Sequence, residues 1–371
     1  MEAEKFPKSF GRYQVLGVLG RGSMGVVYKT KDPVIGRLVA VKSIPETLGL
    51  ETGKEQEYIR RLVQEAKAAG SLQHPNIVTI YDAGETELGP FIAMEYLDGV
   101  TLKEILSSGK KLTMAQITEI VRQVGDGLDY AAQRGIVHRD IKPANLMIVE
   151  GNLVKIMDLG IARLPFSDLT REGRLVGSPS YMSPEQLRGE KLDGRSDLFS
   201  LGIVIYQAVT GKKPFPGQNI QEICFKIINN DFIPSSHLEP SLTEGFDEFM
   251  GKALAKSRDK RFQTGKEMFD TLRKLLLDKE DARESRREEE SVKEKEIPTT
   301  VVRKEEPAYE ESSSVSSSSE SAIDDIFRDL TLTHRSLKLS SEKETKVWQI
   351  VLGMIAGLAV IGIVVWYLIR G

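Results

Sequence analysis

One stretch of the sequence decides the fold: His138-Arg139-Asp140-Ile141-Lys142-Pro143-Ala144-Asn145, followed by Asp158-Leu159-Gly160. Both segments come after short apolar runs, which predicts turns held by strands. The turns present a carboxylate, an ammonium, an amide and a second carboxylate, groups that suit phosphoryl transfer. Asp140 can orient a hydroxyl and accept its proton, while Lys142 neutralises the moving phosphoryl group. Asn145 and Asp158 supply oxygen ligands of the kind that Mg2+ prefers.

Composition excludes several classes of protein. The chain has 371 residues, 40% of them apolar, and a net charge of -3, so it can build a sizeable core but has no basic footprint for nucleic acid. A single cysteine, Cys224, rules out an internal disulfide and suits a reducing compartment. The first residues lack the apolar core of a signal peptide, so we expect the amino-terminal part to stay in the cytoplasm.

At the opening stretch the sequence resembles the catalytic loop and metal-binding turn of the eukaryotic-type (Hanks-type) serine/threonine protein kinases. The resemblance runs from about Tyr13 to about Leu277 and is closest to the bacterial membrane-anchored receptor-type kinases. It implies an α+β, two-lobed fold, with a small β-rich lobe at about 13–94 and a larger helical lobe at about 98–277. Leu159 stands where the family most often has phenylalanine.

A glycine-rich hairpin near the start is a candidate phosphate-binding element. Gly20, Gly22 and Gly25 let the backbone approach phosphate oxygens without a Cβ in the way. The strand-like run Val39-Ala40-Val41-Lys42 follows and places one lysine among apolar residues.

Lys42 needs a carboxylate or phosphate partner. By resemblance this partner is Glu65, in the helical segment from about Lys54 to Ala69, and Glu57 is the less favoured candidate.

The resemblance also implies an adenine pocket, with ATP as phosphoryl donor and Mg2+, for which Mn2+ could substitute, as metal. Met94 would limit the depth of the pocket, the backbone from Glu95 to Leu97 would bind the adenine edge, and apolar side chains would lie above and below the ring. These apolar residues are Val27, Ala40 and Leu146.

The loop from Leu164 to Val176 is the expected site of regulation. Thr170 is placed like the phosphorylated threonine of bacterial receptor-type kinases, and Ser167 is the second candidate. Arg139 and Arg163 would bind the new phosphate and so order the loop.

Beyond this loop, the segment Ser178-Pro179-Ser180-Tyr181-Met182-Ser183-Pro184-Glu185 resembles the family's peptide-docking segment. Glu185 is expected to pair with Arg261, and Asp197 to brace the backbone of the catalytic loop. Cap residues predict three further helix starts, at about Asn219, Thr243 and Thr264.

Composition changes after Leu277. Residues 278–346 are charged and serine-rich and are expected to be a disordered linker, in which the apolar positions of 323–330 are either a docking motif or incidental. Val347–Ile369 is almost wholly apolar and spans roughly 34 Å as a helix, enough to cross a membrane. Lysines before this span predict a single-pass carboxy-terminal anchor with the kinase domain in the cytoplasm.

The sequence therefore predicts a serine/threonine protein kinase that is activated by phosphorylating its own loop. Protein substrates and membrane lipid are the expected partners. Self-association is expected through the kinase domain or through the small residues Gly353 and Gly357 of the span. Two alternatives remain: a catalytically inactive membrane-anchored scaffold, and a small-molecule kinase on the same fold.

Overall fold

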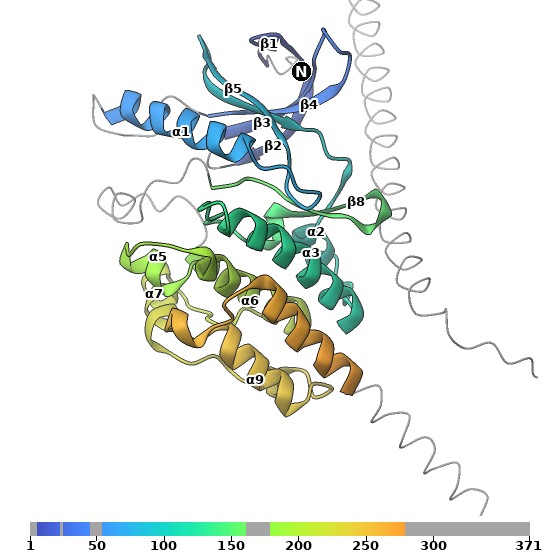
Figure 1. Ribbon diagram of the computed structural model, residues 1–371, viewed down its shortest axis with the longest axis vertical. Coiled ribbons are helices and arrows are strands. Elements are labelled where there is room, and N and C mark those ends of the chain that lie inside the picture. Colours follow the sequence, from blue (N-terminus) through green and yellow to red (C-terminus); the bar gives the residue numbers. More distant parts are fainter. Residues whose placement is uncertain (1–5, 23–24, 45–53, 161–178, 279–371) are drawn as a thin grey trace, which may run out of the picture. The chain divides into compact units, whose positions relative to one another are not determined.

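The computed structural model describes residues 6–22, 25–44, 54–160 and 179–278 (Figure 1). The amino-terminal part is a six-stranded antiparallel sheet of order β1-β2-β3-β4-β6-β5. Helix α1, Lys54–Gly70, packs beside β5 and β6. The strands are β1 Ser9–Phe10, β2 Tyr13–Gly22, β3 Gly25–Lys31, β4 Leu38–Ser43, β5 Ile80–Thr86 and β6 Gly89–Glu95.

Strand β4 shows how this sheet separates core from site. Val39 and Val41 are fully buried in a cluster that includes Phe10, Tyr28 and Phe91. Because side chains alternate along a strand, Ala40 and Lys42 point to the opposite face. The apolar core on one face thus fixes the position of Lys42 on the other.

A second, three-stranded antiparallel sheet carries the catalytic stretch. It consists of β7 Gly99–Thr101, β8 Leu146–Val149 and β9 Val154–Ile156. Backbone bonds from Val78 N–H to Ile156 O (3.0 Å) and from Ile156 N–H to Asn76 O (2.8 Å) tie β9 to the segment before β5. Glu150–Asn152 (η2) is a 3₁₀ turn.

The remainder is helical. Helix α6, Gly194–Thr210, is buried on almost every side, as expected for a helix at the centre of a domain. A Cβ at Gly125 of α3 would lie 3.0 Å from the Cα of Gly265, so these two glycines let α3 and the last described helix, 265–278, touch. The other elements are α2 Leu102–Ser107, α3 Met114–Ala132, η1 Pro143–Asn145, η3 Pro179–Tyr181, α5 Pro184–Arg188, α6 Gly194–Thr210, α7 Ile220–Asn229, α8 Ser235–Leu238, α9 Glu244–Ala253 and η4 Arg258–Lys260.

These elements confirm the expected β-rich amino-terminal lobe and helical carboxy-terminal lobe. Of the three predicted caps, the Asn219 carboxamide accepts from Glu222 N–H (2.8 Å) and the Thr264 hydroxyl from Glu267 N–H (3.0 Å). Thr243 begins α9 without a side-chain cap bond. No helix among the described residues is long and apolar enough to cross a membrane. The predicted span 347–369, and the linker from 279 onward, lie outside the described residues.

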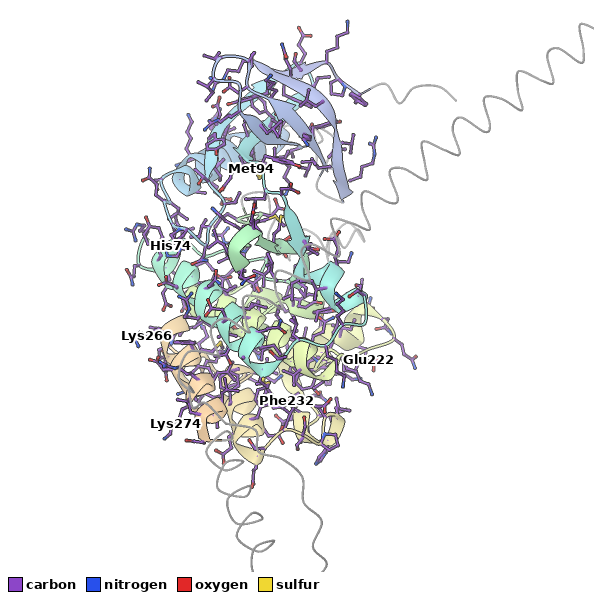
Figure 2. The ribbon with its side chains drawn as sticks, turned by 90° about the vertical axis from the view of Figure 1, so that its right-hand side faces the viewer. His74, Met94, Glu222, Phe232, Lys266 and Lys274 are labelled. Atoms are coloured by element: carbon purple, nitrogen blue, oxygen red, sulfur yellow. The ribbon has the colours of Figure 1, made fainter. Side chains whose placement is uncertain are left out.

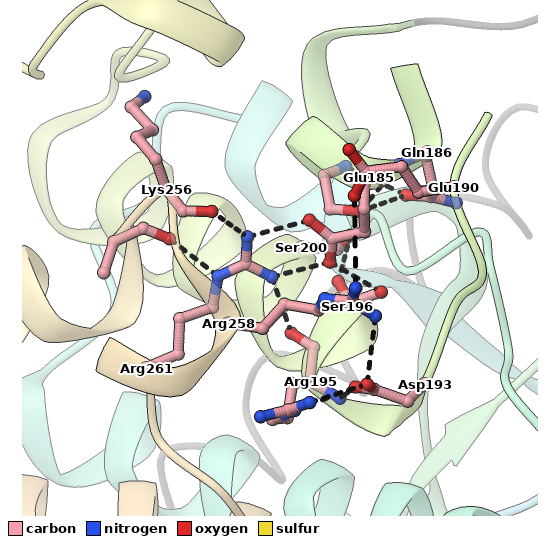
Figure 3. Close-up of polar contacts among 12 residues, drawn as sticks. Glu185, Gln186, Glu190, Asp193, Arg195, Ser196, Ser200, Lys256, Arg258 and Arg261 are labelled. Atoms are coloured by element: carbon pink, nitrogen blue, oxygen red, sulfur yellow. Dashed lines mark hydrogen bonds and ion pairs between the residues drawn. The ribbon is translucent and has the colours of Figure 1, made fainter. Parts of the chain in front are cut away.

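The predicted pair Glu185–Arg261 is present and buried (Figure 3). Arg261 donates to both carboxylate oxygens of Glu185, at 2.7 and 2.8 Å, and both side chains are at most 2% exposed. The Ser196 hydroxyl also donates to Glu185 (2.6 Å). Arg261 reaches the carbonyls of Ala255 (2.6 Å) and Lys256 (3.0 Å), so both charges are paired and hydrogen-bonded.

The titration of Glu185 gives this pair a pH dependence. Burial raises the pKa of Glu185, but the hydrogen bonds and charge of Arg261 and the Ser196 hydroxyl outweigh burial and lower the pKa below 4.5. A carboxyl with a lowered folded-state pKa adds stability above its unfolded pKa. That stability is lost as the pH falls through the folded pKa.

Substitution of Arg261 by Met should lower the free energy of unfolding by about 3–5 kcal/mol, because Glu185 is then buried without a partner. Urea unfolding of the full chain near neutral pH measures this change. The matched control is Lys266→Met, which removes an exposed pair with Asp270 and should cost at most about 0.5 kcal/mol. Equal, small losses in both variants would show that the buried pair is not a major support of the fold.

Candidate active site

The backbone of the catalytic loop is fixed by one carboxylate. Asp197, in the first turn of α6, accepts hydrogen bonds from the backbone N–H of His138 (2.7 Å) and of Arg139 (2.8 Å). Arg139 has a φ of 65°, which is costly for a residue with a side chain, and these two bonds stabilise it. The predicted bracing role of Asp197 thus agrees with the geometry.

The surroundings of Asp197 also shift its pKa. Burial raises its pKa to about 7, although the N–H groups of His138 and Arg139 favour the ionised form. Because both oxygens accept a short hydrogen bond, the geometry described here is that of the ionised carboxylate.

The fully buried imidazole of His138 joins the two turns of the site. Its Nδ1 accepts the backbone N–H of Asp140 (3.2 Å), so the proton lies on Nε2, which donates to the carbonyl of Met157 (2.9 Å). The imidazole therefore bridges the residue that carries the candidate base to the residue before Asp158.

The Asp140 carboxylate lies at the centre of the loop. Its Oδ2 accepts from Lys142 Nζ (2.8 Å) and from Asn145 Nδ2 (3.0 Å). Asn145 Nδ2 also donates to the carbonyl of Asp140 (2.8 Å). Three of the predicted site residues therefore form one hydrogen-bonded group.

The contacts that the structure shows for Lys42 and Glu65 differ from the predicted pairing of these two residues. Lys42 Nζ lies 2.9 Å from Asp158 Oδ1, and Glu65 lies 3.5 Å from Arg139 Nη1. The Lys42 side chain is only 12% exposed, so its ammonium requires a close partner, which the Asp158 turn supplies. Glu65 is closer to the guanidinium of the catalytic loop.

The Asp158 turn approaches the catalytic loop closely. Asp158 has a φ of 53°, and Gly160 N–H donates to His138 O (2.9 Å). A Cβ on Gly160 would lie 2.5 Å from the same oxygen, so only glycine fits there. Leu159 is buried, as expected for the hydrophobic residue of this turn.

Asn145 and Asp158 fit a magnesium site by donor chemistry. Because the Asn145 amide nitrogen is committed to Asp140, its carbonyl oxygen remains as a ligand, and Asp158 keeps Oδ2 beyond the bond to Lys42. Burial opposes ionisation of Asp158, but Lys42 and then Lys142 lower its pKa. Among the described residues no group of three or more His, Cys, Asp or Glu could hold a metal, so substrate phosphates would supply further ligands.

The predicted nucleotide residues lie on the facing strands. Gly20, Gly22 and Gly25 are in the hairpin of β2 and β3, where Gly22 pairs with Gly25 and Gly25 has a φ of 123°. Met94 is the last residue but one of β6 and lies at the end of this strand that is next to the helical part (Figure 2). The predicted apolar walls occupy strands of both sheets: Val27 in β3, Ala40 in β4 and Leu146 in β8.

The segment after Met94 connects the two sheets. Leu97 lies between β6 and β7, outside any strand. The backbone N–H of Glu95 is bonded to Thr79 O (2.9 Å), so it is engaged within the protein. The Glu95 side chain accepts from Lys155 Nζ (2.9 Å), a bond that sequence reasoning missed although Lys155 is a lone charge in an apolar strand.

The docking segment is attached to the catalytic loop. Ser183 caps α5 in a capping box with Gln186, and Gln186 Nε2 donates to Arg139 O (2.8 Å). Sequence reasoning did not single out Gln186. Thr170, Ser167 and Arg163, with the rest of 161–178, lie outside the described residues.

Comparisons with known proteins agree with this geometry. The family model for the protein kinase domain matches residues 13–273. The chain is 40% identical over 265 residues to the probable serine/threonine-protein kinase SCO3848 of Streptomyces coelicolor, covering 70% of this chain and 39% of that protein. It is 39% identical over 264 residues to the serine/threonine-protein kinases PknB of Mycolicibacterium smegmatis and of Mycobacterium tuberculosis, covering 69% of this chain and 42% of each.

The chain spans about two fifths of the length of these curated relatives. The family match covers well over half of this chain, and its relatives are bacterial kinases of the Hanks type. The chain therefore belongs to the protein kinase domain family.

Proposed function

We propose that this protein transfers the γ-phosphoryl group of ATP to serine or threonine hydroxyls of other proteins. The observation that carries the proposal is the Asp140 carboxylate, held by Lys142 and Asn145 in a loop whose backbone is fixed by Asp197. A positioned carboxylate beside a cation and an amide is what this reaction requires.

Each side chain has a part in the reaction. Asp140 orients the substrate hydroxyl and accepts its proton as the oxygen attacks phosphorus. Lys142, 2.8 Å from Asp140, stabilises the negative charge on the transferring group. Lys42 positions the phosphates of ATP, and the hairpin of β2 and β3 covers them.

The residues Asn145 and Asp158 would hold Mg2+, which neutralises charge on the phosphates when bound; Mn2+ would use the same oxygen ligands. Lys42 and Asp158 are already in contact, so the groups for phosphate and metal are adjacent before the substrate binds.

The docking segment supports a protein substrate over a small molecule. It is attached through Gln186 to the catalytic loop, and its Tyr181 and Met182 are held in place by bonds to Gln207 (2.6 Å) and Pro179 (2.9 Å). Lys142 favours serine and threonine, because by resemblance tyrosine kinases of this family usually replace that lysine. An inactive scaffold would have no need of the complete Asp140, Lys142 and Asn145 group.

The location remains a prediction of the sequence. We propose that Val347–Ile369 anchors the protein in a membrane and that the kinase domain faces the cytoplasm. Helix contact through Gly353 and Gly357 would bring two kinase domains together. Protease added outside intact cells should leave the kinase domain intact. Digestion of the kinase domain would show that it faces the outside and would contradict the proposed topology.

Asp140→Asn should retain ATP binding and lose about 10²–10⁴-fold in kcat, because an amide cannot accept the hydroxyl proton. The measurement is phosphate incorporation into a generic protein substrate by the full chain with magnesium and ATP. Asp270→Asn, an exposed carboxylate in the last described helix, is the matched control and should act as wild type. Near-normal turnover by Asp140→Asn would contradict the proposed mechanism.

We also propose that phosphorylation of Thr170 activates the enzyme, with Ser167 as the second candidate. A phosphate on this loop would bind Arg139, whose side chain is 40% exposed and whose Nη1 lies 3.5 Å from Glu65. Thr170→Ala should therefore lower activity and abolish the lag that precedes full activity in unmodified wild type, while Ser167→Ala should change neither. Mass spectrometry after incubation with ATP locates the phosphate, and a fully active enzyme without phosphate in 161–178 contradicts this switch.

A further inference from the structure

Lys213 lies on a rigid turn beside the docking segment. The turn follows α6, whose last residue is capped by Gly211 in the left-handed conformation, with a φ of 71°. The Thr210 hydroxyl accepts Lys212 N–H (3.1 Å), and the buried ring of Phe215 stacks on Phe199. These bonds and contacts fix the backbone on both sides of Lys213.

The ammonium of Lys213 points at the docking segment. Its Nζ lies 5.1 Å from the ring centroid of Tyr181, and the Tyr181 hydroxyl donates to Gln207 (2.6 Å). Tyr181 O accepts the Ser200 hydroxyl (2.7 Å), so the aromatic ring is held from both ends. Lys213 therefore lies over the surface that receives a peptide in the proposed function.

This ammonium has no carboxylate partner within the part of the chain that the structure describes. Lys213 is half-buried, and burial alone lowers its pKa. Other lysines that are withdrawn from water are compensated: Lys155 by Glu95 (2.9 Å), and Lys256 by the carbonyl of Ile227 (2.8 Å).

A half-desolvated cation without a counter-charge is unfavourable, and a ligand carboxylate that reaches it would gain a pairing that the described residues do not supply. The side chain that faces Lys213 on the docking segment is the aromatic ring of Tyr181, whose hydroxyl is bonded to the neutral carboxamide of Gln207 in α6, so an incoming carboxylate meets no like charge from these two residues.

We propose that Lys213 is a specificity-determining residue that selects protein substrates with an acidic side chain close to the phosphorylated serine or threonine. The proposal rests on the proposed function. It assigns to the surface of Tyr181, Gln207 and Lys213 a preference for Asp or Glu at one substrate position near the acceptor.

The test uses the full chain, purified in detergent, and peptides in which a single Glu or Gln is placed in turn at each position around one acceptor. Gln has the shape of Glu without its charge, so the ratio of kcat/KM for the two peptides isolates the charge. At one position wild type should favour Glu roughly five- to tenfold, the range for a partly shielded ion pair. Raising the salt concentration should reduce this ratio.

Lys213→Met should bring the ratio to about one, Lys213→Arg should keep it, and Lys213→Glu should favour a peptide with Lys at that position. The matched control is Lys212→Met, which removes an exposed positive charge one residue away and should leave the preference intact. Urea midpoints establish that each variant is folded. If Lys213→Met does not fold, the ratio of kcat/KM for the Glu and Gln peptides is compared between Lys213→Arg and Lys213→Glu. Equal ratios in these two variants would overturn the proposal.

An unchanged ratio in folded Lys213→Met, or a wild type with no preference for Glu at any position, overturns the proposal and shows that Lys213 only packs on Tyr181. Absence of phosphorylation of every peptide, including the Gln series, instead overturns the proposed function on which it rests.

Discussion

The site depends on the two hydrogen bonds by which Asp197 holds the backbone of His138 and Arg139, at 2.7 and 2.8 Å. Burial raises the pKa of Asp197 to about 7, and a carboxyl with a raised folded-state pKa contributes less stability as the pH rises from about 4 to about 7. At a pH above about 7, where this carboxyl is ionised, its burial therefore lowers the stability of the fold. The buried Glu185–Arg261 pair supports the start of the same helix, since Arg261 also donates to Arg195 O (3.3 Å).

The ion pairs Lys42–Asp158 and Glu65–Arg139 connect the two lobes in this structure. Lys42 and Asp158 are 2.9 Å apart, with side chains 12% and 36% exposed, whereas Glu65 and Arg139 are 45% and 40% exposed and 3.5 Å apart. An exposed pair of this kind contributes at most about 1 kcal/mol. Helix α1 is thus joined to the catalytic loop by a weak contact, and the stronger one connects β4 to the metal-binding turn.

The pairing of Glu185 with Arg261 and the bracing role of Asp197 could be predicted because the family resemblance implied both. The structure adds the physical reason, since the buried Glu185 needs a cation and the buried Asp197 needs hydrogen-bond donors. The contact between Lys42 and Asp158 was not predicted, because the choice between Glu65 and Asp158 depends on where helix α1 lies. The bridge made by His138 was not predicted either, since it joins the backbone of Asp140 to the backbone of Met157, which lies in the other turn.

The most direct test of this account is the steady-state rate of phosphoryl transfer by Asp197→Asn at about pH 8, where the wild-type carboxylate is ionised. An asparagine oxygen accepts only one of the two N–H groups, and its own NH2 faces the other. We expect a folded protein whose kcat is lower by about 10²-fold, since small displacements of a positioned base are costly, with a nearly unchanged KM for ATP. A kcat close to that of wild type would contradict the claim that Asp197 sets the geometry of the catalytic loop.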